Sequence, residues 1–259
     1  MVWVRRRMSH LIWLNDDSWS IVEPLLPNNQ PGARRVDDRR VISGILHVLR
    51  TGCPWRNCPS EYGPSTTIYN RFNRWSRRGI WQKIYDALAA EARIGGTVAI
   101  DSTYVKAHRS AAGAKKKEAK DQAIGISRGG RSTKIHVAVN VVGQPIGLLL
   151  GPGQQADIKA ADELAGKIGP FDRLIADRAY DADRFRQTLR EAGVQPVIPG
   201  RRNRAEPIRH DKKRYRERWR VEATIGRLKD FRRVATRYDK LARTFLDTIA
   251  LAAIYMFWL

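Results

Sequence analysis

The first ninety or so residues place apolar side chains at the three- and four-residue spacing of amphipathic helices. This spacing, together with the positions of Pro and Gly, predicts four helices at about 16–26, 38–51, 65–78 and 81–92. Asp16 or Asp17 can cap the first of them and Asp37 the second, since a short acidic side chain accepts from the free N–H groups of a first turn. The pattern therefore predicts a small all-α domain over residues 1–95.

The third predicted helix has one apolar face and one basic face. Its apolar positions recur at i, i+4 and i+7, at Ile68, Phe72 and Trp75. Asn70, Arg71 and Arg74 point elsewhere. A basic, Asn-bearing helix in a small bundle is typical of helix-turn-helix proteins that read the major groove of DNA. The segment alone fits a structural helix with a solvated basic face equally well, and the charge of the whole chain favours DNA contact.

From residue 96 the pattern changes to short strands alternating with helices. Apolar or alternating runs predict strands at 98–109, 133–140, 146–150, 173–177 and 195–198. Helical spacing predicts helices at 156–168, 183–192, 215–233 and 241–258. Three antiparallel-type strands, followed by helices and strands in turn, indicate a mixed α/β domain over residues 96–259.

Residues 111–131 lie between two of these strands and are rich in Ala, Lys and Gly. The composition predicts a basic flexible loop, either one that touches phosphate or an ordinary solvated one. Its last part, 125–132, is one residue from a phosphate-binding P-loop, with Arg131 where lysine belongs. A P-loop requires a strand before it and a helix after it, whereas a β-patterned segment follows here, so a nucleotide hydrolase is disfavoured.

The charge of the chain narrows the class of partner. The 259 residues include 48 Lys and Arg against 26 Asp and Glu, a net charge of +22, and 42% are hydrophobic. A chain with enough apolar residues for a core and such a basic excess favours a folded protein that binds nucleic acid. Cys53 and Cys58 have no second pair to complete a zinc site and fit reduced thiols in a cytoplasmic protein. The apolar stretch 244–259 is too short to span a membrane and predicts a buried helix.

Three acidic residues on different predicted elements carry most of the chemical information. Asp101 ends one apolar run, Asp177 ends another, and Glu222 lies in the helix at 215–233. Two carboxylates at strand ends and a third on a later helix can converge on one point. Converging carboxylates suit Mg²⁺, which prefers oxygen ligands together with water and phosphate.

The helix around Glu222 carries a polar stripe. At about 100° per residue, Tyr215, Arg218, Glu222 and Lys229 project within about 60° of one another. An i,i+4 ion pair between Arg218 and Glu222 is the simpler explanation, but it leaves Tyr215 and Lys229 unexplained. The core face is expected at Trp219, Ile225, Val221 and Leu228. Residues 201–243 hold 17 Lys and Arg against 6 Asp and Glu, a balance of +11, so the stripe is predicted to lie on a phosphate-binding surface.

These motifs resemble those of a known family. The spacing Tyr215-x2-Arg218-x3-Glu222-x6-Lys229 resembles the Tyr-Arg-Glu-Lys signature of bacterial insertion-sequence DDE transposases, in the broad group of families four and five. The segments 100–103 and 176–181 resemble the family's first and second Asp motifs. The runs 52–56, 62–64 and 69–72 are similar to the amino-terminal domain of the family-five branch. The resemblance covers nearly the whole chain and keeps the order of the motifs.

The resemblance implies a ribonuclease H-like catalytic domain that follows a helix-turn-helix-like domain. Asp101 would lie on the first strand, Asp177 after the fourth and Glu222 on the following long helix. It implies that the trio holds two Mg²⁺ ions, or Mn²⁺ in their place, about 4 Å apart around a phosphodiester. DNA ends would be cut and their 3′-hydroxyls joined to target DNA by in-line attack.

The resemblance also suggests roles for the rest of the polar stripe. Arg218 and Lys229 are expected to contact phosphate, and Tyr215 to pack or hydrogen-bond near the cut. The expected partners are the terminal inverted repeats of the element, target DNA, and a second copy of the chain on that DNA. The expected location is the cytoplasm, at the nucleoid.

Two other functions stay open from the sequence. A metal-dependent nuclease of the same fold would cut DNA without joining it, and a DNA-binding repressor would do neither. The intact acidic trio favours an enzyme over a repressor. Met1 and Met8 are both possible starts of the chain.

Overall fold

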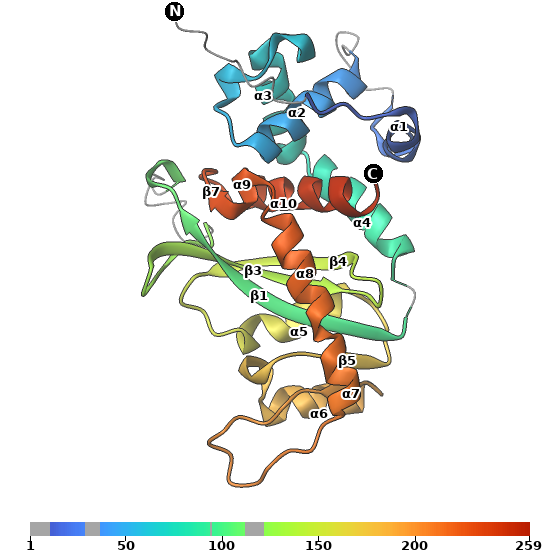
Figure 1. The fold of residues 1–259 in the computed structure, drawn as a ribbon, viewed down its shortest axis with the longest axis vertical. Helices are drawn as coiled ribbons and strands as arrows, with labels where there is room; N and C mark the ends of the chain where they lie inside the picture. Colours follow the sequence, from blue (N-terminus) through green and yellow to red (C-terminus); the bar gives the residue numbers. More distant parts are fainter. Residues whose placement is uncertain (1–10, 29–36, 94, 112–121) are drawn as a thin grey trace, which may run out of the picture.

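The structure is a computed structural model that describes residues 11–28, 37–93, 95–111 and 122–259. The alternative start at Met8 and the central part of the predicted loop 111–131 lie outside the described residues. Figure 1 shows the N-terminal helices gathered at one end of the molecule, a twisted sheet in the middle, and further helices at the other end.

The N-terminal part contains the four predicted helices, which are α1 (Asp16–Val22), α2 (Asp38–Thr51), α3 (Ser65–Arg77) and α4 (Ile80–Glu91). The predicted cap of the first helix is wrong. Asn15 caps α1 by accepting from Ser18 N, and the two aspartates lie in its first turn, where they face the positive end of the helix dipole. Helix α1 also ends early, since 23–25 form a 3₁₀ turn. Asp37 caps α2 as predicted, and Gly52, at φ 73°, ends it in the left-handed conformation that glycine favours.

The sheet is mixed, and the described residues contribute seven strands to it. These are β1 (Thr97–Ala107), β2 (Gly125–Ser127), β3 (Gly130–Val139), β4 (Pro145–Pro152), β5 (Arg173–Ile175), β6 (Gln195–Val197) and β7 (Thr236–Arg237). The order is β2-β3-β1-β5-β6, with β4 also on β3 and β7 on the end of β1. Strands β1, β3 and β4 are antiparallel, whereas β5 and β6 run parallel to β1. This is the ribonuclease H-like arrangement that the motifs imply.

Two short strands were not predicted. Strand β7 has only two residues, too few for a recognisable alternation. Strand β2 pairs with the start of β3 in a hairpin, so the C-terminal end of the predicted flexible loop 111–131 is regular structure. The hairpin also agrees with the prediction that 125–132 is not a P-loop. The glycine-rich run forms β2 and the start of β3, whereas a P-loop is followed by a helix.

The remaining helices are α5 (Ile158–Lys167), α6 (Asp183–Glu191), α7 (Lys212–Tyr215), α8 (Trp219–Leu228), α9 (Arg232–Ala235) and α10 (Ala242–Phe257). The long helix predicted at 215–233 differs in detail. It begins at Lys212, where Asp211 caps it by accepting from Arg214 N, and it tightens into a 3₁₀ turn at Arg216–Arg218 before α8. In Figure 1 the rod formed by α7 and α8 crosses the face of β1.

The sheet separates two hydrophobic clusters. On one face Val98 and Ile100 pack with α5 and α6. On the other, Ala99 and Val105 pack with α8, α10 and the N-terminal helices in one continuous cluster. The chain changes from helix to strand between α4 and β1, yet both parts share this core. Their division into separate domains at residue 95 stays a prediction.

Helix α10 lies between the N-terminal helices and the sheet, and most of its side chains are buried. The prediction of a buried C-terminal helix is therefore confirmed. In the described part of the chain, no helix has the length and apolar character needed to cross a membrane.

One predicted core residue of α8 is wrong. Val221 and Leu228 are buried, and Ile225 is partly buried, but the Trp219 side chain is 60% exposed. At about 100° per residue, Trp219 falls roughly 160° from Val221 and roughly 180° from Leu228, so helical spacing itself places it opposite the buried side of α8.

Candidate active site

The register of two parallel strands brings Asp101 and Asp177 to one place. Ala99 pairs with Ile175, so the two aspartates come two residues further along neighbouring chains. Side chains two residues apart on a strand share a face, so both carboxylates point to the face covered by α8. Asp101 Oδ1 accepts from Ser102 N at 2.8 Å, and Asp177 accepts from Ala179 N at 2.8 Å.

Arg218 links Asp101 to the third acidic residue. Its Nη2 donates to Asp101 Oδ2 at 2.7 Å, and its Nη1 forms an ion pair with Glu222 one turn further along the rod. The Glu222 side chain is 54% exposed, so the site opens to solvent on its helical side. The predicted i,i+4 pair exists, and the same guanidinium also reaches across to the sheet.

The charges of the site act on one another. Burial raises the pKa of Asp101; Arg218 opposes this shift, while the nearby Asp177 and Glu222 carboxylates add to it. Burial alone would lower the pKa of Arg218, but Asp101 and Glu222 raise it overall. The three carboxylates therefore lie within electrostatic reach of one another, around a single cation.

The other two residues of the polar stripe also face the sheet. Lys229 Nζ donates to Thr103 Oγ1 at 2.6 Å, two residues beyond Asp101 on β1, and burial lowers the pKa of Lys229. Tyr215 is partly buried and packs against the ring of His210 at 5.3 Å. Burial raises its pKa, Arg218 opposes the shift, and Asp177 reinforces it. The structure thus brings all four stripe residues to the edge where the aspartates lie.

The trio does not form a ready metal cage. Across residues 11–28, 37–93, 95–111 and 122–259, no three His, Cys, Asp or Glu side chains are arranged to hold a metal ion. The physical reason is Arg218, whose guanidinium lies between Asp101 and Glu222 and neutralises both. The expected convergence of the carboxylates is therefore occupied by a protein cation.

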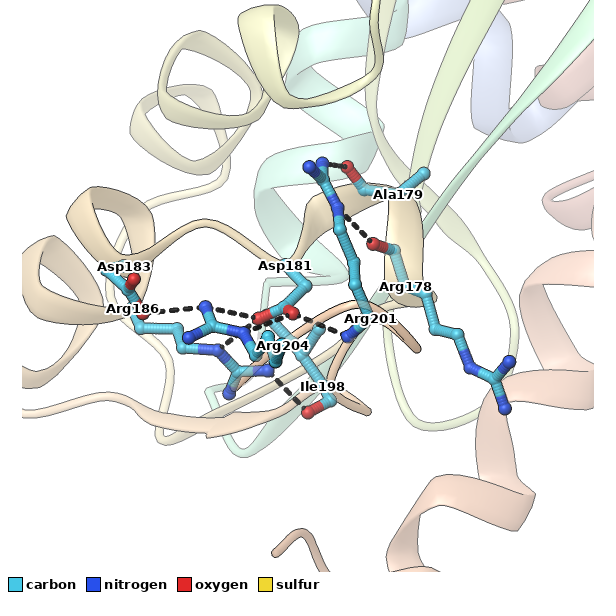
Figure 2. A network of polar contacts seen from close by, with 8 residues as sticks. All are labelled: Arg178, Ala179, Asp181, Asp183, Arg186, Ile198, Arg201 and Arg204. Atoms are coloured by element: carbon cyan, nitrogen blue, oxygen red, sulfur yellow. Dashed lines mark hydrogen bonds and ion pairs between the residues drawn. The ribbon is translucent and has the colours of Figure 1, made fainter. Parts of the chain in front are cut away.

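A buried ion-pair network fixes the turn that carries Asp177. Figure 2 shows Arg186, Arg204 and the backbone of Arg201 converging on Asp181, while the Arg178 side chain points away. Asp181 is fully buried and binds Arg186 Nε at 2.8 Å, Arg204 Nε at 2.7 Å and Arg201 N at 2.7 Å. Burial alone would raise its pKa, but these donors lower it to about 2. Asp181 therefore anchors the basic segment after β6.

A second support lies behind Asp101 and was not predicted. Ser102 Oγ donates to Asp157 Oδ1 at 2.6 Å, and Lys134 Nζ lies 2.8 Å from the same oxygen. Ser102 N also holds the Asp101 carboxylate, so the contact with Asp157 positions this part of β1. Asp157 precedes α5, far from Ser102 in the sequence, and no local pattern marks such a contact.

The predicted DNA contacts on α3 divide into two kinds. Asn70 and Arg74 are exposed, as a DNA-contacting face requires. Arg71 is buried, forms an ion pair with Asp38 of α2, and stacks over Trp75 with its Cζ 5.0 Å from the ring centroid. The predicted role of Arg71 in DNA contact is therefore corrected to a structural one, because its charge is committed to a neighbouring helix.

Comparison with known families decides the identity of the chain. Residues 14–85 match the family model "Putative transposase of IS4/5 family", and residues 94–257 match the model "Transposase DDE domain". The chain belongs to the insertion-sequence DDE transposases. In this transposase the acidic residues of the DDE domain are expected at Asp101, Asp177 and Glu222, the positions that carry its motifs.

Curated relatives of this transposase also come from insertion sequences. It is 33% identical over 107 residues to "Insertion element IS402 uncharacterized 16.2 kDa protein" of Burkholderia cepacia, and the match covers 36% of this chain and 73% of that protein. It is 32% identical over 131 residues to "Putative transposase for insertion sequence element IS6501" of Brucella ovis, which covers 49% of this chain and 98% of that protein.

Among solved structures, the transposase is similar to a piggyBac transposase in a synaptic complex with hairpin DNA, determined by cryo-EM. The TM-score is 0.46 at 11% sequence identity, and the match covers 94% of this chain and 72% of that chain.

Proposed function

We propose that this transposase cuts the ends of an insertion sequence and joins the freed 3′-hydroxyls to target DNA by metal-dependent, in-line phosphoryl transfer. The observation that carries the proposal is the shared guanidinium of Arg218. It holds Asp101 of the sheet and Glu222 of the rod at one point, beside the turn that presents Asp177.

The residues of the site fit a divalent cation. Arg218 now pairs with Asp101 and Glu222, so these two carboxylates already hold one cation and could hold a metal once the guanidinium leaves them. Carboxylate oxygens are the donors that Mg²⁺ prefers, and Mn²⁺ accepts the same set. Asp101, Asp177 and Glu222 would hold the metal, which when bound lowers the pKa of water and stabilises charge on a leaving oxygen.

The chain's own cations would bind and orient the DNA strand. A phosphate at the site competes with the carboxylates for Arg218, since a guanidinium binds phosphate with two parallel hydrogen bonds. Its transfer to phosphate would free Asp101 and Glu222 for their ligand role. Lys229, held beside Thr103, would contact the next phosphate along β1. Tyr215 would pack against the sugar or donate a hydrogen bond near the cut.

The test is strand cleavage on DNA that flanks this reading frame. An end-labelled duplex carrying the element end is incubated with the protein and Mg²⁺, beside the Glu222→Gln variant. The matched control is Glu217→Gln on the same rod, because the ion pairs of Glu217 within the described residues are with its neighbours Arg214 and Arg220. Nicking at the element end that survives Glu217→Gln and is lost in Glu222→Gln supports the proposal.

The products of this reaction separate the alternatives. A nicked strand that joins a second duplex identifies a transposase, whereas nicking without joining identifies a nuclease. Tight binding of the element end without cleavage by either protein would overturn the proposal in favour of a repressor.

The proposal also requires two ends in one assembly. We therefore propose that the exposed Asn70 and Arg74 of α3 contact the terminal repeats, and that at least two copies of the chain act together on DNA. Light scattering of the protein with an element-end duplex tests the second point. A complex that contains one protein per duplex at saturation would contradict it.

A further inference from the structure

A groove lies between the N-terminal helices and the C-terminal part of the chain, away from the acidic site. Its volume is about 940 Å³. One wall comes from α3 and the turn before it, and the other from the segment between α9 and α10. The groove follows Ala107, the last residue of β1, since Ser110 contributes to it. The strand rises about 3.3 Å per residue, so Ala107 lies about 20 Å from Asp101 along β1.

Aromatic rings cover both walls. Trp55 and Tyr69 line one wall with their ring centroids 5.6 Å apart, and Tyr238 lines the other. Tyr69 and Tyr238 are among the large apolar side chains that the protein leaves exposed. Exposed rings on two facing walls are unusual for packing alone, because burial of each ring would stabilise the fold.

Cations are placed among these rings. The Arg233 guanidinium lies 5.1 Å from the ring centroid of Trp55 and 5.5 Å from that of Tyr238. Arg233 is buried, and its Nε has no hydrogen-bond partner among the described residues. Arg77 and Lys240 line the same groove and are exposed, against the single acid Asp239, which accepts from Thr248. The groove therefore combines stacking surfaces with a surplus of positive charge.

We propose that this groove binds an unpaired nucleotide of the DNA substrate, with its base stacked on the Tyr69, Trp55 and Tyr238 rings and its phosphate on Arg77 or Lys240. Sequence-independent sites for single-stranded DNA combine these two features, because every base has a stacking face and every link a phosphate. The size falls within the range of about 300–1,000 Å³ that suits small ligands, so a nucleotide enters where a duplex does not. The proposal rests on the proposed function for its DNA substrate.

The test uses a fluorescein-labelled strand of twelve thymidines, which does not pair with itself. Its binding is measured by anisotropy at high salt, where contacts to phosphate alone weaken and stacking persists. Tyr69→Ala combined with Tyr238→Ala should weaken binding about tenfold or more, whereas the two tyrosines changed to Phe should keep wild-type affinity. Both positions are exposed, so equal melting temperatures are expected and confirm that each variant is folded.

Equal affinity of the alanine variant and the wild type would overturn the proposal. So would crosslinking of a 4-thiothymidine strand only to peptides outside 52–77 and 233–244. Asp101→Asn separates this proposal from the proposed function, since it should abolish nicking and leave strand binding intact. If the wild type binds the strand through the rings but does not nick DNA, only the proposed transposase reaction is overturned. If it nicks DNA but its binding does not depend on the rings, only the proposed role of the groove is overturned.

Discussion

Arg218 Nη2 lies 2.7 Å from Asp101 Oδ2, and the same guanidinium pairs with Glu222. Arg218 therefore holds two of the three acidic residues that are proposed to bind the metal. The contact stabilises the site without DNA, because the Arg218 charge opposes the effect of burial and of the neighbouring carboxylates, which together raise the pKa of Asp101. It also makes Arg218 a competitor of the metal.

Replacement of Arg218 should separate these two effects. In Arg218→Ala, end nicking should fall about 100-fold or more, since a positioned charge at the phosphate is lost. Without DNA, however, Mg²⁺ should raise the melting temperature of Arg218→Ala more than that of the wild type. Thermal unfolding with and without Mg²⁺ measures this. An equal Mg²⁺ effect on both proteins would show that Arg218 does not compete for the carboxylates.

Lys229→Ala should weaken binding of the element end. Its ammonium lies beside Thr103, near Asp101. Loss of one phosphate contact should reduce the slope of log K against log salt concentration by about 1. Titrations at several salt concentrations measure both quantities. Lys167→Ala is the matched control, because Lys167 lies on α5, which covers the other face of the sheet, and is largely exposed. Unchanged binding and cleavage in Lys229→Ala would remove its assigned role.

The sequence predicts most of the fold because helices and strands that bury only one face repeat their apolar residues at a regular spacing. Each of the four N-terminal helices and the main strands appears within a few residues of its expected bounds. The approach of Asp101 to Asp177 is predictable for a related reason, since residues that end apolar runs on neighbouring parallel strands come side by side. Elements of two or three residues, such as β2 and β7, are too short for any period to show.

What the sequence does not predict depends on contacts between distant segments. Arg71 reads as part of a basic surface until α2 brings Asp38 against it. The sequence predicts the ion pair of Arg218 with Glu222, four residues along the same helix. It does not predict the ion pair with Asp101, because that contact depends on how the rod packs on β1.

Arg71 and Arg74 should give opposite phenotypes although they lie one turn apart on α3. Arg71→Ala removes a buried ion pair with Asp38 and the contact with the Trp75 ring, and should destabilise the protein by about 3 kcal/mol or more. Arg74→Ala should leave stability within about 0.5 kcal/mol and weaken DNA binding. Urea unfolding and end-binding titrations of both variants check this. A stable Arg71→Ala with weak DNA binding would restore the interpretation drawn from the sequence.

Asp181→Ala should both destabilise the protein and reduce cleavage. It leaves Arg186 buried without its ion-pair partner and should cost about 3 kcal/mol or more. Because the folded pKa is lowered to about 2 from 3.8, the stabilisation is present above pH 4 and is lost as the pH falls from about 4 to 2. Asp183→Ala is the control, since Asp183 is exposed and contacts the same Arg204. Equal stability of the two variants at pH 7 would contradict the assigned role of the network.

Asp247 should make the protein more stable in mild acid than at neutral pH. It is buried on α10, and burial raises its pKa to about 6, although the hydrogen bond from Gln82 opposes the shift. A raised folded pKa means that the carboxylate resists ionisation in the fold. The loss of stability caused by ionisation of Asp247 is absent below about pH 4, grows between about pH 4 and 6, and is complete above that range.

Asp247→Asn should remove this cost, because an amide keeps the acceptor for Gln82 and carries no charge. At about 1.4 kcal/mol per pKa unit, the variant should gain about 3 kcal/mol at pH 8 and little at pH 4. Urea unfolding at the two pH values measures the difference, with Asp86→Asn, an exposed position on α4, as the control. A variant that is less stable than the wild type at pH 8 would mean that the ionised carboxylate is compensated by its surroundings, and that α10 uses the charge to hold the helices of the two halves together.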